Sequence, residues 1–116
     1  MQNYIKFLAK VENFNETNID MFKRYLYINS TFFHMHEVNK CTLDIDAKNL
    51  DLEVFREYSD LKKCDLTIIK YNNEVDYIEK INISNGENPN IEKIYIESIN
   101  DLSEYEIFNI LSNYLD

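Results

Sequence analysis

The only glycine and the only proline of the chain lie close together, at Gly86 and Pro89. Both fall in the segment Ser84-Asn-Gly-Glu-Asn-Pro-Asn90, which is predicted to be the main surface loop, because these two residue types are the strongest breakers of regular structure. A chain with so little glycine and proline is not collagen-like or linker-like, and it cannot build a glycine-rich phosphate-binding loop. Continuous helices and strands are expected over the rest of the sequence.

One globular domain, residues 1–116, is expected from the length and composition. The chain has 116 residues, of which 45% are hydrophobic and 14% aromatic, and a chain of this size buries roughly two-thirds of the surface that it exposes when unfolded. Lys6, Lys10 and Glu12 interrupt the apolar run that a secretory signal would need. No membrane span, a cytoplasmic location and free, partly buried thiols at Cys41 and Cys64 are therefore predicted.

The first half of the chain contains two segments whose periodicity fits two structures. Residues 4–14 fit a strand or a helix, with a weak preference for the strand, and residues 49–63 fit either, with end charges that favour the helix. Between them, the pattern Thr17-Asn-Ile-Asp20 resembles a capping box and predicts a helix over 18–28. Strands are predicted over 31–38 and 41–46, and the second should have one solvated face that carries Asp44 and Asp46.

The second half shows clearer signals. Strands are predicted over 65–71 and 74–83, joined by a two-residue hairpin turn at Asn72-Asn73, because asparagine tolerates positive φ. A further strand follows over 91–99. Ser103-Glu-Tyr-Glu106 is a second capping-box pattern and starts the last helix.

The resulting element order is β-α-β-β-(α)-β-β-β-α, in which the parenthesis marks the ambiguous segment 49–63. This order predicts an α+β domain: a mainly antiparallel sheet of about five strands with two or three helices packed on one face.

Negative charge is concentrated in the second half of the domain. The formal net charge is −9, from 12 basic and 21 acidic residues. Residues 1–63 are nearly neutral, with nine basic and ten acidic residues, whereas residues 64–116 hold three basic and eleven acidic residues. This charge excludes direct binding to nucleic acid or to anionic membranes. It serves either solubility alone or the binding of a basic partner protein.

The predicted partner-binding surface consists of carboxylates and tyrosines from the acidic half. Tyr71, Tyr77, Tyr95, Tyr105 and Tyr114 lie among the carboxylates, and at least half of these rings are expected to be core residues with the hydroxyl at the edge. Exposed tyrosine next to carboxylates is favourable interface material. The residues predicted to contact the partner are Glu74, Asp76, Glu79, Glu97, Asp101, Glu104, Glu106, Tyr77 and Tyr105.

Catalytic and metal-binding signals are weak. His34 and His36 would project from the same side of a strand, with Glu37 or Cys41 as a further ligand, but a closed metal site normally needs four ligands. The six serines lack a nucleophile-elbow context, and Cys41 lacks a setting that would lower its pKa. No cofactor, no metal and no enzymatic activity are therefore expected.

Three functional hypotheses remain, in order of preference. The first is a small acidic inhibitor that occludes a basic, nucleic-acid-acting protein, either as a toxin-immunity protein or as a phage anti-defence protein of the anti-CRISPR type. The second is a structural or scaffolding domain that self-associates, for example as a homodimer. The third and weakest is a metal-dependent enzyme that uses His34 and His36.

Overall fold

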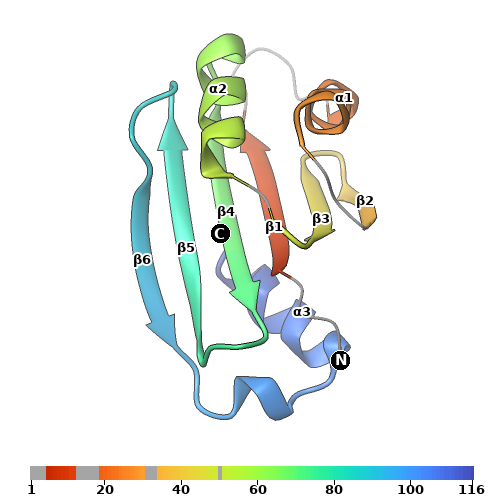
Figure 1. Ribbon diagram of the computed structural model, residues 1–116, viewed down its shortest axis with the longest axis vertical. Coiled ribbons are helices and arrows are strands. Elements are labelled where there is room, and N and C mark those ends of the chain that lie inside the picture. The colour runs from red at the N-terminus through yellow and green to blue at the C-terminus, as the bar shows by residue number, and fades with distance from the viewer. Residues whose placement is uncertain (1–4, 13–18, 31–33, 50) are drawn as a thin grey trace.

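A six-stranded antiparallel sheet forms the centre of the protein (Figure 1). The computed structural model describes residues 5–12, 19–30, 34–49 and 51–116. The spatial order of the strands is β2-β3-β1-β4-β5-β6. The predicted α+β class is confirmed, with one strand more than the expected five. The strands are β1 (Ile5–Glu12), β2 (His34–Asn39), β3 (Thr42–Ala47), β4 (Asp65–Asn72), β5 (Tyr77–Ser84) and β6 (Asn90–Tyr95).

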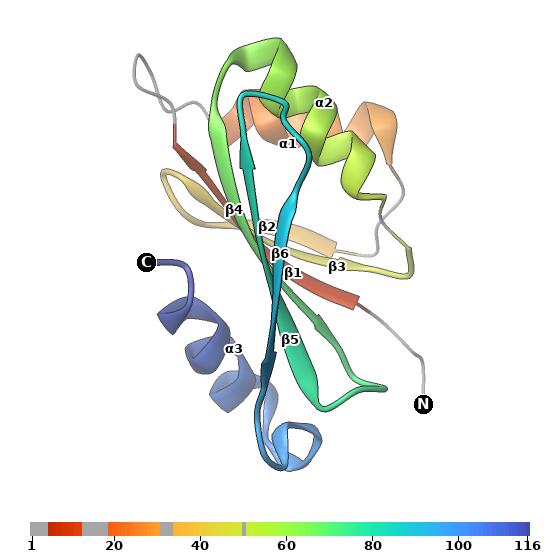
Figure 2. The same cartoon turned by 90° about the vertical axis from the view of Figure 1, so that its left-hand side faces the viewer.

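The helices lie on both faces of this sheet rather than on one (Figure 2). Helices α1 (Ile19–Asn29) and α2 (Leu52–Lys62) cover one face, and α3 (Glu104–Asn113) packs against the other. The reason is visible in β1, where Phe7 packs toward α1 and α2 whereas its neighbour Leu8 packs toward α3. Because alternate side chains of a strand point to opposite faces, a strand with apolar residues at consecutive positions needs cover on both sides.

Two hydrophobic cores result, one on each face. The larger core, under α1 and α2, contains a chain of aromatic contacts: the Phe22 ring lies 6.0 Å from Phe55 and 4.8 Å from Tyr58, and Phe55 lies 5.8 Å from Phe7, all between ring centroids. The smaller core lies under α3 and the short 3-10 helix η1 (Ile99–Asp101). Its buried members are Leu8, Ile69, Tyr71, Ile78, Ile99, Ile107 and Leu111.

Both ambiguous segments adopt the preferred structure. The described part of 4–14 is strand β1, and 49–63 contains helix α2. Asp51 caps this helix, since its side chain accepts a hydrogen bond from the Glu53 amide at 2.9 Å, and Lys63 ends it in the left-handed conformation with φ 52°. Residues 4, 13–14 and 50 lie outside the described residues.

The other helices and strands predicted for the first half also agree with the structure where it describes them. Helix α1 matches the predicted 18–28 within one residue at each end, although Thr17 of the expected capping box lies outside the described residues. Strands β2 and β3 match the predictions for 31–38 and 41–46, with 31–33 again outside the described part. Both cysteines are free thiols, as predicted; Cys41 is partly buried, whereas Cys64 is fully buried rather than partly.

The predicted β4–β5 hairpin is confirmed, but the prediction of a two-residue turn is wrong. The register pairs Tyr71 with Ile78 and Ile68 with Ile81, so the connection runs through Asn73–Asp76. A turn at Asn72-Asn73 would instead have placed Asp76 opposite the buried Ile69. Register follows the burial of the apolar set, which here outweighs the preference of a dipeptide for a tight turn.

Strand β6 is shorter than the predicted strand 91–99. It ends at Tyr95, and Ser98 adopts the left-handed conformation with φ 58°. The chain therefore turns and delivers Ile99 into the smaller core, where its side chain is fully buried. The strand ends early because the chain turns to bury Ile99 under α3. The β-branched residues that favour a strand continue to Ile99 in the sequence, which is why the sequence predicts the longer strand.

Candidate functional site

Six of the seven predicted carboxylates lie at one end of the molecule. The β4–β5 connection, the end of β6, η1 and the first turn of α3 meet there, at the bottom of Figures 1 and 2. All six side chains are exposed, and none forms an ion pair with another described residue. These six residues, called the acidic end below, are Glu74, Asp76, Glu97, Asp101, Glu104 and Glu106.

Hydrogen bonds hold the segments of the acidic end together. The Ile96 amide donates to the Asp76 carbonyl at 3.0 Å, which ties the end of β6 to the start of β5. The Tyr71 hydroxyl bonds Oδ1 of Asn100 at 2.8 Å, which ties η1 to β4. As expected for part of the tyrosines, the Tyr71 ring is a core residue with its hydroxyl at the edge. The carboxylates are therefore presented on a fixed scaffold.

The capping box predicted at the start of α3 is present. The Ser103 hydroxyl accepts from the Glu106 amide at 3.2 Å, and Oε1 of Glu106 accepts from the Ser103 amide at 3.3 Å. The Glu106 side chain therefore also stabilises the start of its own helix. The cap places Glu104 and Glu106 in the first turn, where negative charge is favourable next to the positive end of the helix dipole.

The contribution of this cap to the stability of the protein can be tested by substitution of Ser103. Replacing Ser103 with alanine should lower the free energy of unfolding by about 1 kcal/mol, because the amide of Glu106 loses its acceptor. Urea denaturation followed by circular dichroism measures the change. Ser103→Asn is the matched control, because its side-chain oxygen can accept from the same amide, and it should cost at most about a few tenths of a kcal/mol. Equal stability of the alanine variant and wild type would contradict the role of this cap.

Glu79 and Tyr77, also predicted to bind the partner, have contacts within the chain. Glu79 pairs with Lys70 at 3.7 Å. The half-buried Tyr77 ring packs against Tyr95, with centroids 5.4 Å apart, and Nζ of Lys93 lies 4.9 Å from the centroid of the same ring. These contacts lie on β4, β5 and β6, on the sheet face that α1 and α2 share. Glu79 is thus part of a local ion pair rather than of the acidic end.

Two tyrosines next to the acidic end are strongly exposed. Tyr105, in the first turn of α3, is 75% exposed, and Tyr95, at the end of β6, is 70% exposed. Tyr105 belongs to the predicted set. Tyr95 does not, although it lies among the carboxylates in the sequence. Alternation along β6 predicts the sheet face on which Tyr95 lies. Only the tertiary structure shows that no described helix covers that face at Tyr95.

A second polar cluster, which the sequence did not predict, lies on the α3 face of β1, β2 and β3. Nζ of Lys6 is 2.8 Å from Oδ1 of Asp44 and 3.0 Å from Oδ1 of Asp46. Nε2 of His36 is 3.7 Å from Oδ2 of Asp44, and Nε2 of His34 is 2.8 Å from Nδ1 of His36. The expected solvated face of β3 is therefore wrong for Asp44, which is only 5% exposed.

Register explains why these groups meet. Asp46 is paired with Lys6 of β1 on one side and with His34 of β2 on the other, and Asp44 is paired with His36. Burial alone would lower the pKa of Lys6, but the hydrogen bonds and charges of Asp44 and Asp46 outweigh it, so the pKa is raised. Lys6 is therefore a buried cation whose charge is balanced by two carboxylates.

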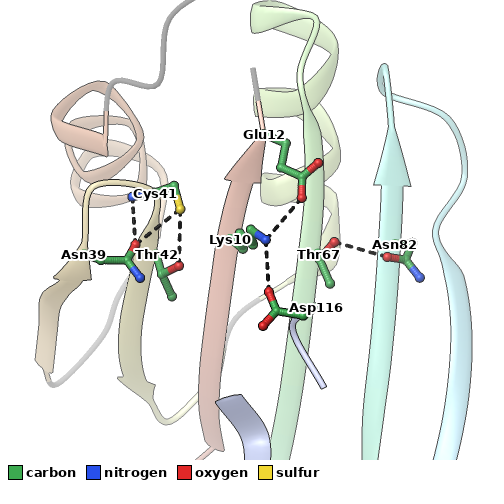
Figure 3. A network of polar contacts seen from close by, with 8 residues as sticks. All are labelled: Lys10, Glu12, Asn39, Cys41, Thr42, Thr67, Asn82 and Asp116. Atoms are coloured by element: carbon green, nitrogen blue, oxygen red, sulfur yellow. Dashed lines mark hydrogen bonds and ion pairs between the residues drawn. The ribbon is translucent and has the colours of Figure 1, made fainter. Parts of the chain in front are cut away.

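Further polar contacts and open pockets lie along the same face. In Figure 3, Nζ of Lys10 lies between Glu12 and Asp116, at 3.4 and 3.3 Å, and Sγ of Cys41 lies 3.2 Å from Oδ1 of Asn39. An open pocket of about 260 Å³ runs from these residues to the C-terminal segment. Most of its polar lining is already engaged, since Lys10 pairs with Asp116 and Sγ of Cys41 contacts Asn39 and Thr42.

Within the described ranges 5–12, 19–30, 34–49 and 51–116, no group of three or more His, Cys, Asp or Glu side chains could hold a metal ion. None of the helices in these ranges is long and apolar enough to cross a membrane.

Comparison with known proteins gives no family assignment. No family model, no curated protein and no solved structure matches this chain.

Proposed function

We propose that the protein is a small inhibitor that binds a basic, nucleic-acid-acting protein through the acidic end. It would act in the cytoplasm as a toxin-immunity protein or as a phage anti-defence protein of the anti-CRISPR type, by occlusion and without catalysis of its own. The observation that carries the proposal is the gathering of six exposed carboxylates, without intramolecular ion pairs among the described residues, at one end of a fixed scaffold.

Electrostatics favours this class of partner. Neighbouring carboxylates add their fields within the Debye length, which is about 8 Å at physiological ionic strength. Proteins that act on nucleic acids carry basic grooves shaped for phosphates, and a rigid set of carboxylates can occupy such a groove. Charge complementarity of this kind raises the rate of association and fixes orientation more than it raises affinity.

The exposed tyrosines support a contact surface rather than a merely solvated one. Tyr95 and Tyr105 are 70% and 75% exposed next to the acidic end. Tyrosine is enriched in the buried centre of interfaces, because its ring supplies apolar area and its hydroxyl a hydrogen bond. The proposed contact therefore combines carboxylates that steer the partner with two rings that pack on it.

Charge reversal tests the proposal. The partner would be captured from cells that encode this chain and identified by mass spectrometry, and its association rate with the purified protein measured from low to high salt. In the triple variant Glu97→Lys, Asp101→Lys, Glu104→Lys, the low-salt rate should fall by about 10-fold or more, and its salt dependence should flatten.

The matched control reverses three exposed carboxylates elsewhere, in the triple variant Asp20→Lys, Glu87→Lys, Glu92→Lys. Both triple variants carry the same net charge, so a position-specific effect must come from the acidic end. Equal rates for the two variants would show that only bulk charge matters and would contradict the proposed surface. A captured partner without a basic nucleic-acid-binding groove would contradict the proposed class.

A second candidate, self-association, is favoured by the edge of the sheet. Among the described strands, β6 pairs only with β5, and its side chains Ile91 and Tyr95 are 45% and 70% exposed. An open edge strand presents unpaired backbone groups that a second copy can pair with. Light scattering distinguishes the two functions: a homodimer that persists at high salt, without any captured basic partner, would favour a scaffolding role.

A further inference from the structure

The two histidines of β2 form a pair whose geometry differs from that of ordinary surface histidines. His34 and His36 are both exposed, occupy alternate positions of an edge strand and project from the same face. Nε2 of His34 lies 2.8 Å from Nδ1 of His36, and the ring centroids are 4.8 Å apart. This distance is that of a hydrogen bond between the two rings, in which one nitrogen donates and the other accepts. A metal ion that displaces the shared proton can bind both nitrogens after small rotations of the exposed rings.

The type and number of the ligands select among metal ions. Imidazole nitrogen suits Cu²⁺ and Ni²⁺, and the affinity of a given nitrogen site for divalent ions rises through Ni²⁺ to Cu²⁺ and falls again at Zn²⁺. Two imidazoles can occupy two positions of the square-planar or tetragonal geometry of Cu²⁺ and Ni²⁺, whereas a closed tetrahedral Zn²⁺ site needs four ligands.

Asp44 is placed to orient the pair. Its Oδ2 lies 3.7 Å from Nε2 of His36, while Oδ1 is held by the buried Lys6 at 2.8 Å. A carboxylate next to one imidazole nitrogen favours the proton on that nitrogen and leaves the other nitrogen with a free lone pair. For His36, the lone pair is then on Nδ1, which accepts the hydrogen bond from Nε2 of His34 and becomes available to a metal ion once that proton is released.

Lys6 explains why the site is open rather than closed. Asp44 and Asp46 stand opposite the two histidines in the β2–β3 register and would complete a four-ligand set. Both carboxylates instead face the ammonium group of Lys6, at 2.8 and 3.0 Å. A metal ion on the histidines therefore keeps its remaining coordination positions for solvent or for small ligands.

We infer that His34 and His36 form an open two-histidine chelate for Cu²⁺ or Ni²⁺ on the edge strand β2. The inference is independent of the proposed inhibitory function, because it concerns another edge of the sheet. It assigns no catalytic step and concerns metal binding alone.

A titration of the full-length, tag-free chain with Cu²⁺ tests the inference, by calorimetry and by electron paramagnetic resonance. One Cu²⁺ per chain should bind, with spectral coupling to two imidazole nitrogens. His34→Asn and His36→Asn should each weaken binding by about 10-fold or more, because the second ligand no longer acts at high effective concentration. Both histidines are exposed, so these variants should retain the wild-type circular dichroism spectrum.

Two further measurements separate this site from other copper ligands. Cys41→Ser removes the nearby thiol and should leave the affinity for Cu²⁺ unchanged, and Zn²⁺ should bind more weakly than Cu²⁺. Absence of stoichiometric Cu²⁺ binding would overturn the inference. So would binding that survives both histidine substitutions, or binding that disappears in Cys41→Ser.

Discussion

Replacing Lys6 with methionine is expected to lower the free energy of unfolding by about 3–5 kcal/mol. The substitution keeps most of the apolar length of the side chain but removes the ammonium group that lies between Asp44 and Asp46. Lys6 is 8% exposed and Asp44 is 5% exposed. A buried carboxylate that loses its cation cannot recover the lost interaction from water, so the cost exceeds that of an exposed ion pair.

Urea denaturation at neutral pH, followed by circular dichroism, measures this cost. Lys10→Met is the matched control, because Lys10 pairs with Glu12 and Asp116, whose side chains are 58% and 88% exposed, and it should cost less than about 1 kcal/mol. Adding Asp44→Asn and Asp46→Asn to the Lys6 variant should restore part of the stability, since no buried charge is left unpaired. Similar losses for the Lys6 and Lys10 variants would contradict a special role for the buried pair.

The pH dependence of the same difference gives a second measurement. The folded-state pKa of Lys6 is raised above its usual 10.5 by Asp44 and Asp46, against the effect of burial. Its contribution is therefore fully present below pH 10.5 and is lost as the pH rises through the folded-state pKa. The stability difference between wild type and Lys6→Met should narrow above pH 10.5. A difference that stays constant through this range would show that the charge of Lys6 is not its cause.

Replacing Gly86 with alanine is expected to lower the free energy of unfolding by about 2–5 kcal/mol. Gly86 has φ +75°, and a β-carbon there would lie 2.8 Å from Cα of Asp60, closer than nonbonded carbons approach. The loop cannot easily move away. The Gly86 amide donates to the buried Ser59 hydroxyl at 2.9 Å, and its carbonyl accepts from Nη1 of Arg56 at 3.0 Å.

Asn85→Gly is the matched control for this substitution. Asn85 also has positive φ, 50°, but it is exposed, and glycine adopts this conformation without strain. The control should change stability by less than about 1 kcal/mol in either direction. If Gly86→Ala were as stable as wild type in urea denaturation, the close approach of this loop to α2 would not contribute to the fold.

The sequence predicts the elements well where the signal is local. The Ser103 capping box, the N-terminal acid and C-terminal lysine of α2, and the loop around Gly86 and Pro89 all occur where residue type indicates them. Each depends on groups within a few residues of one another. The prediction failed at the Asn72-Asn73 turn, because there the pairing of distant isoleucines sets the register.

The candidate sites likewise depend partly on local sequence and partly on contacts between distant residues. The concentration of charge in residues 64–116 is a property of the sequence, but its presentation depends on Ile99, whose burial brings η1 and α3 next to the β4–β5 connection. The pairing of Lys6 with Asp44, 38 positions apart, follows only from the neighbouring positions of β1 and β3 in the sheet. The composition of the chain does not distinguish Lys6 from the other lysines.

By itself, the sequence determined the types of element, their order and the half of the chain that carries the charge, because periodicity, capping and composition act over short distances. The tertiary structure decided which carboxylates are exposed together, which pair with Lys6 and Lys70, and that His34 and His36 are hydrogen-bonded to one another, with His36 next to Asp44. These outcomes depend on strand order and register. Both are set by the burial of apolar side chains far apart in the sequence.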